Sequence, residues 1–92
     1  MKTIYKYKLT QECNHIETYK DAIVLSAGLD PNEVPCVWMQ VDTEQELEYK
    51  CIFIAGTGWN LEALFGDDIN NFKYINTFQQ GPFIWHVYEE VK

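Results

Sequence analysis

The feature that most limits how this chain can fold is the alternation of apolar and polar residues in short runs separated by turn-forming residues. In the first run, IYKYKL, Tyr5, Tyr7 and Leu9 fall on one face of an extended strand, and Lys6 and Lys8 fall on the other. A strand of this kind has one buried face and one solvated face. The pattern therefore predicts a β-strand here, and the same reasoning extends along most of the chain.

Further strands are expected in six other runs. Within the run VPCVWMQVD, Val37, Met39 and Val41 share one face. The run LEYKCIFIAG is apolar on both faces at its far end, which predicts a strand covered on both sides there, by another sheet, a helix or a partner chain. The six runs cover residues 15–19, 22–28, 34–42, 47–56, 72–78 and 82–91.

One short helix is expected, at residues 59–66 (WNLEALFG). Asn60 can cap its first turn, Leu61, Leu64 and Phe65 are spaced for one face, and Gly66 can end it. Because the chain is only 92 residues long, we expect a single domain over residues 1–92. The predicted fold class is mostly β (α+β at most): six to seven short, mainly antiparallel strands with one short helix, in a compact sheet or partly open barrel.

The charge of the chain excludes some partners. The formal net charge is −7, and every basic residue is a lysine. Arginine is the usual bidentate partner of phosphates and guanines, so we expect no binding to duplex nucleic acid. An acidic chain is suited instead to contact with a basic protein surface. The run DTEQELE places Asp42, Glu44, Glu46 and Glu48 two residues apart, which would line one strand face with carboxylates or simply protect a hairpin edge.

The sequence predicts a cytoplasmic protein without metal or cofactor. Lysines interrupt the N-terminal segment, so no signal peptide is expected, and no apolar run reaches the length of a membrane helix. We therefore expect no contact with a membrane. The three cysteines, Cys13, Cys36 and Cys51, have no C-x-x-C spacing, and two histidines add no zinc-ligand pattern. Free thiols in a reducing compartment are expected.

Gly56, Thr57 and Gly58 form the first candidate site, between a predicted strand and the predicted helix. The segment is neither a Walker motif nor a dinucleotide fingerprint, because the required lysine and third glycine are absent. It is either a tight turn that needs positive φ or a turn whose backbone N–H groups face an anion. The indole of Trp59, which follows, could stack on a base or fill the core.

Other candidate ligand-binding residues lie near the two ends of the chain. His86 and Tyr88 alternate on one face of the last predicted strand, and no nucleophile stands in a recognisable context beside His86. We therefore expect His86 to be structural or to contact a ligand, and we predict no catalytic residues. Lys6 and Lys8 either form a solvated face or meet phosphates as point charges.

The ordered set IYKYKL, VWMQVD, GTG, YINT and FIWHVYE resembles a family of small uncharacterised proteins encoded by phages and prophages. The resemblance covers nearly the whole chain. It implies a compact, mostly β protein in the cytoplasm of an infected bacterium, and it supplies no catalytic residues.

Two functions follow from these expectations. In the first, the chain is a non-enzymatic phage accessory protein that counters bacterial immunity by sequestering a nucleotide-type immune signal. In the second, it is an inhibitor that docks on a host defence protein through its acidic and aromatic surface. A small virion protein is a further alternative. Because the core of so short a chain is thin, a homo-oligomer could complete the ligand site.

Overall fold

The computed structural model describes residues 1–91, which form seven strands, one short α-helix and one 3-10 turn. The mostly β fold class predicted from the sequence is confirmed. The elements are β1 (Lys2–Lys8), β2 (Cys13–Tyr19), β3 (Ile23–Leu29), β4 (Pro35–Asp42), β5 (Leu47–Gly56), α1 (Leu61–Phe65), η1 (Ile69–Asn71), β6 (Phe72–Gln80) and β7 (Phe83–Glu90).

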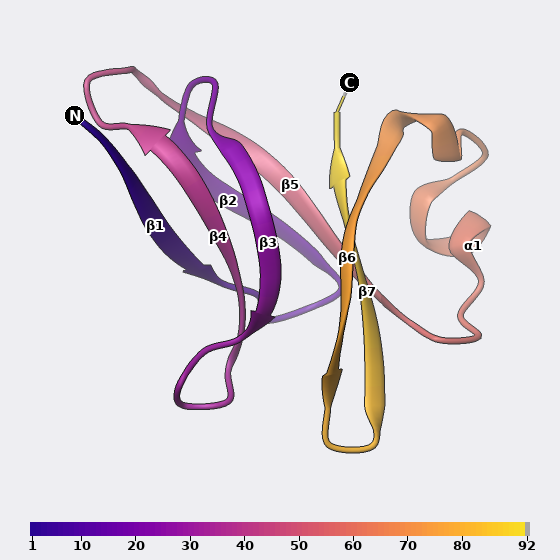
Figure 1. The fold of residues 1–92 in the computed structure, drawn as a ribbon. Coiled ribbons are helices and arrows are strands. Elements are labelled where there is room, and N and C mark those ends of the chain that lie inside the picture. Colours follow the sequence, from indigo (N-terminus) through magenta and orange to yellow (C-terminus); the bar gives the residue numbers. More distant parts are fainter. Residues whose placement is uncertain (92) are drawn as a thin grey trace.

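The strands form two antiparallel sheets that face each other (Figure 1). One has three strands in the order β1-β4-β3, and the other has four in the order β2-β5-β7-β6. The loops joining β1 to β2, β3 to β4 and β6 to β7 lie at one end of the molecule, and the two chain termini lie at the other. The arrangement is a flattened barrel that does not close.

The core lies between the inner faces of the two sheets. Val37, Met39 and Val41 of β4 are buried there, as their alternation predicts. Ile52 and Ile54 of β5 face them from the second sheet. On the opposite face of β5, Leu47 and Tyr49 are exposed, so only the far half of this strand is covered on both sides, as expected from its sequence.

Side chains join the two sheets along their edges. On one side, Asn76 of β6 uses its amide to pair with the backbone of Ala27 in β3. The Ala27 N–H donates to Asn76 Oδ1, and Asn76 Nδ2 donates to the Ala27 carbonyl, both at 2.8 Å. On the other side, the Tyr7 hydroxyl of β1 lies 2.9 Å from the Thr18 hydroxyl of β2. These contacts hold the barrel together where backbone pairing stops.

Helix α1 covers the outer face of the four-stranded sheet. Asn60 caps it as predicted, because its side-chain oxygen accepts the Ala63 N–H at 3.1 Å, and Gly66 ends it with a φ of 78°. Phe65 packs on Phe72 with ring centroids 4.3 Å apart, and both rings contact Phe53 edge to face. This aromatic cluster anchors the end of α1 on the outer face of the sheet.

Candidate ligand-binding site

The segment Gly56-Thr57-Gly58 is a tight turn at the end of β5. The Trp59 N–H donates to the Gly56 carbonyl at 3.1 Å, and Gly58 adopts a φ of 88°, which favours glycine. The Thr57 N–H donates to the Ile84 carbonyl at 3.3 Å. The N–H groups of Thr57 and Trp59 are therefore bonded within the protein and do not face an anion.

Gly56 has a different role from Gly58. A Cβ atom on Gly56 would lie 2.7 Å from Trp59 Nε1, which is closer than real Cβ contacts allow. The missing side chain lets the indole of Trp59 lie directly on the backbone of the strand end. Trp59 also packs edge to face on Trp85, with ring centroids 5.7 Å apart, yet it remains 44% exposed. Part of this indole is therefore available to a ligand.

His86 is held by hydroxyl groups on both sides of its ring. Nε2 lies 2.8 Å from Thr57 Oγ1, and Nδ1 lies 2.9 Å from Thr77 Oγ1. The Thr77 hydroxyl lies in turn 2.6 Å from the Tyr74 hydroxyl. With both nitrogens engaged, the imidazole orients the Thr57 hydroxyl and is not free to bind a metal.

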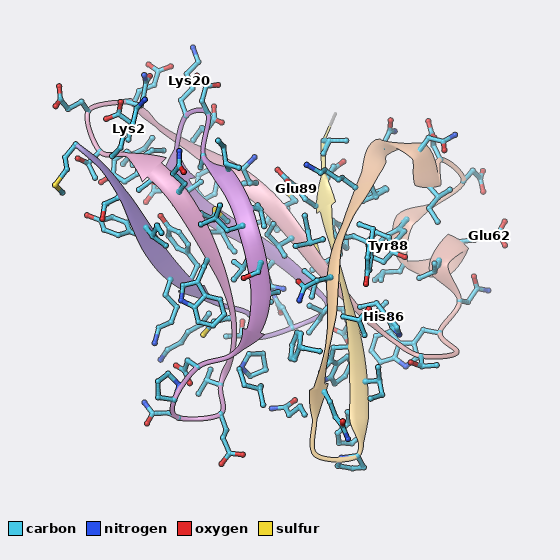
Figure 2. All side chains as sticks on the ribbon, viewed as in Figure 1. Lys2, Lys20, Glu62, His86, Tyr88 and Glu89 are labelled. Atoms are coloured by element: carbon cyan, nitrogen blue, oxygen red, sulfur yellow. The ribbon has the colours of Figure 1, made fainter. Side chains whose placement is uncertain are left out.

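A pocket of about 230 Å³, which we call the turn pocket, opens beside this turn on the outer face of the four-stranded sheet. Figure 2 shows His86 and Tyr88 on the side of β7 that faces α1. The pocket thus brings together six of the eight ligand-binding residues predicted from the sequence. It is lined by Ala55, Gly56, Thr57, Gly58, Trp59, Leu61, His86 and Tyr88.

The two predicted lysines lie elsewhere. Lys6 and Lys8 belong to β1, in the other sheet. Lys6 Nζ binds Asp30 Oδ2 at 2.9 Å, and the Asp30 side chain is only 3% exposed. The Val34 N–H and the Lys6 ammonium lower the pKa of Asp30 to about 2. Lys6 therefore stabilises the β3–β4 loop, and a single site containing all eight predicted residues does not form within one chain.

The acidic run does not line one strand. Asp42 ends β4, and the chain then turns, with the Gln45 N–H donating to the Asp42 carbonyl at 3.0 Å. The N-terminal ammonium lies 3.3 Å from Asp42 and 3.1 Å from Glu44. A continuous row of four carboxylates is therefore excluded, because a tight turn separates the first pair from the strand that begins at Leu47.

The cysteines are free, and two of them lie beside His15. Cys51 Sγ is 3.2 Å from His15 Nδ1, and Cys13 Sγ is 3.6 Å from His15 Nε2. Burial raises the pKa of both thiols. Within residues 1–91, no group of three or more His, Cys, Asp and Glu side chains is arranged to hold a metal ion.

Thr77 and Tyr74 are the site residues that sequence reasoning missed. Thr77 faces His86 directly across the β6–β7 hairpin. Its role could have been found only from the register of that hairpin, which runs without a shift from the Gln80–Phe83 pair at the turn to the Thr77–His86 pair.

Comparison with known proteins gives one match, over residues 1–92, to the family model described as "Domain of unknown function (DUF7352)". The chain belongs to the DUF7352 family. No curated protein and no solved structure matches it. The family description names no activity, so the function of this DUF7352 member has to be argued from its pocket. Among the helices of residues 1–91, none has the length and apolar character needed to span a membrane.

Proposed function

We propose that this protein is a non-enzymatic binding protein that sequesters a nucleotide-type small molecule, with the base of the ligand held in the turn pocket. The observation that carries the proposal is the convergence of the Gly56–Trp59 turn with His86 and Tyr88 of β7 around one opening. These segments lie far apart in the sequence. Their aromatic rings and hydroxyl groups are the chemistry that recognises a planar, polar ring.

Each wall of the turn pocket has a separate task in this proposal. The partly exposed indole of Trp59 and the ring of Tyr88 supply stacking surfaces. The Thr57 hydroxyl supplies a hydrogen bond, and its bond to His86 sets its direction. When Thr57 donates to His86 Nε2, its oxygen can accept from a base, and when Nε2 carries the proton, the hydroxyl hydrogen can be donated to the base. His86 contributes through this orientation and not as a general base.

The size and charge of the site indicate which part of the ligand is recognised. The volume of about 230 Å³ is below the roughly 300–1,000 Å³ of sites that enclose drug-sized molecules. It therefore accommodates a base, with the sugar and phosphates outside. No lysine lines the pocket, and Figure 2 shows Lys2 and Lys20 far from His86. With a net charge of −7, recognition of the base contributes more than recognition of phosphate.

The biological setting of the proposal comes from the resemblance to phage and prophage proteins. A small protein that retains a nucleotide immune signal in the cytoplasm of an infected bacterium would counter the host's immunity without catalysis.

The second candidate, an inhibitor of a host defence protein, is supported by the uncovered outer face of the three-stranded sheet. Ile4 and Ile23 are 57% and 53% exposed there, on either side of Gln40 in β4.

Thermal unfolding with a panel of ligands tests the proposal. Adenosine, guanosine, their monophosphates and cyclic dinucleotides are each added over a series of concentrations. A specific ligand present at about 100 times its own dissociation constant stabilises the fold by ~2.7 kcal/mol. We expect at least one base to raise the Tm, and the matching nucleoside to bind at least as tightly as the nucleotide. Chromatography of the same mixtures is expected to return the ligands unchanged.

Two variants give the comparison its control. Trp59→Ala is expected to abolish the ligand-induced shift, whereas Tyr49→Ala removes an exposed aromatic ring from the same sheet, outside the turn pocket, and should leave it intact. If no base changes the Tm, or if both variants bind equally well, the turn pocket is not the site. Consumption of a nucleotide would overturn the non-enzymatic assignment.

A further inference from the structure

A second pocket lies on the other side of Trp59, and residues of the β1–β2 loop and of both sheets line it. The β1–β2 loop lies at the end of the molecule opposite the chain termini (Figure 1). Its volume is about 400 Å³, and we call it the end pocket. Leu9 and Ile54 form an apolar floor, and Trp59 and Trp85 form an aromatic wall. Glu12 lies at the rim of this pocket and also lines the neighbouring surface beside α1, next to Trp59.

The loop that carries Glu12 is rigidly held. Asn14, which is buried, accepts the N–H groups of Thr10 and Gln11 with its side-chain oxygen at 2.9 and 3.3 Å, and donates to the Gln11 carbonyl at 2.7 Å. The Ile54 N–H donates to the Glu12 carbonyl at 2.9 Å. These bonds fix the backbone at the rim before any ligand arrives, which lowers the entropic cost of binding.

The aromatic wall is also held in place. Trp85 Nε1 donates to Gln80 Oε1 at 3.0 Å, and the plane of Trp85 is at 86° to that of Trp59. The close approach of Trp59 to Gly56 fixes the second indole. The two perpendicular indoles both line the opening, and a cation is attracted to the face of an indole that is not covered by another ring.

Among residues 1–91, no cation forms an ion pair with Glu12 at the rim. The ion pairs of residues 1–91 join Met1 to Asp42 and Glu44, Lys6 to Asp30, and Lys50 to Glu89, so none of them involves Glu12. Glu12 is exposed and belongs to a chain of net charge −7. The local carboxylate, the overall charge and the electron-rich indole faces all attract a positive group.

We infer that the end pocket binds an organic cation, an ammonium or guanidinium group on an apolar stem. The stem packs on Leu9 and Ile54, while the charged head lies between the indoles and the Glu12 carboxylate. This site is separate from the turn pocket and takes a ligand of opposite charge. A free amine or guanidine and the side chain of a lysine or arginine on another protein share this chemistry.

Nuclear magnetic resonance of the three indole N–H groups tests the inference. Butylguanidinium is titrated against butylurea, its neutral isostere, at low salt. We expect butylguanidinium to shift the signals of Trp59 and Trp85, and butylurea to bind at least about fivefold more weakly. Trp38, on the outer face of the three-stranded sheet, serves as an internal reference. Equal binding of the two compounds, or no shift at Trp59 and Trp85, would overturn the inference.

Matched variants separate this site from the turn pocket. Glu12→Gln is expected to weaken butylguanidinium binding about threefold, the size of a partly solvated charge contact, while Glu17→Gln, an exposed control in β2, leaves it unchanged. Thr57→Val should affect only the turn pocket. A blocked Gly-Lys-Gly peptide and pentylamine distinguish the two sources: tighter binding of the peptide indicates a protein partner, and tighter binding of the free amine indicates a small molecule. If Glu12→Gln binds butylguanidinium as the parent does, the rim carboxylate has no part in recognition and the inference is wrong.

Discussion

Replacing Asn76 with alanine removes both hydrogen bonds that join β6 to β3, and it leaves the N–H and the carbonyl of Ala27 without partners. Ala27 is buried, so water cannot readily replace the lost bonds. Each buried backbone group left unpaired costs ~1–3 kcal/mol. Because Asn76 is only half-buried, we take the lower part of this range for each group. The expected loss in the free energy of unfolding is ~2–4 kcal/mol.

Urea unfolding followed by circular dichroism measures this loss. A change of 1 kcal/mol corresponds to ~4–8 °C in Tm for a domain of this size, so Asn76→Ala should also lower the Tm by roughly 15 °C. Asn76→Asp keeps an acceptor for the Ala27 N–H but places a carboxylate beside the Ala27 carbonyl, and we expect a loss of similar size. Asn70→Ala, at an exposed position in η1, is the control and should change stability by less than ~0.5 kcal/mol.

The result that would refute this reasoning is an Asn76→Ala protein as stable as the parent, with the same dependence on urea. The two sheets would then be held together by the apolar core and the Tyr7–Thr18 contact, and the Asn76 bridge would be a consequence of their packing. A smaller dependence on urea would point to another outcome, a native state that has already opened along the β3–β6 edge.

Three further predictions concern the loop, the turn and the helix cap. The pKa of Asp30 in the folded protein, about 2, lies below its ordinary value of 3.8. The contribution of Asp30 to stability is therefore present above pH ~4 and is lost as the pH falls towards 2. Asp30→Asn should remove this part of the decrease of the urea unfolding midpoint in acid. Gly56→Ala should displace the Trp59 indole, seen as a changed indole N–H resonance and as weaker binding in the turn pocket. Asn60→Ala should lower the free energy of unfolding by ~1 kcal/mol, measured in urea, through loss of the helix cap.

The strands and their buried faces could be predicted because alternation is a local property of the sequence. Val37, Met39 and Val41 were expected to share a face, and that face is the core. The cap at Asn60 was equally local, because a capping side chain bonds within its own turn. The division into two sheets could not be predicted, because the alternation of apolar and polar residues does not determine which strands pair with each other.

For the candidate site, the residue types could be selected from the sequence, but their positions relative to one another could not. The Gly56–Trp59 turn, His86 and Tyr88 could be selected by residue type, and the pairing of β5 with β7 brings them together. Lys6 was selected on the same grounds but binds Asp30, a contact that depends on the path of the β3–β4 loop. Thr77 was missed because a threonine in a strand carries no signal until its neighbour across the hairpin is known.

The indole of Trp59 forms a wall of both the turn pocket and the end pocket. The ring is held between Gly56 and Trp85, so a proposed ligand that displaced it from one pocket would also change the space in the other. Thermodynamic linkage then requires the effect to be mutual: whatever factor one ligand imposes on the affinity of the second, the second imposes on the first. Under the two binding proposals, this one side chain would couple the two sites, so that the amount of one ligand retained would depend on the concentration of the other.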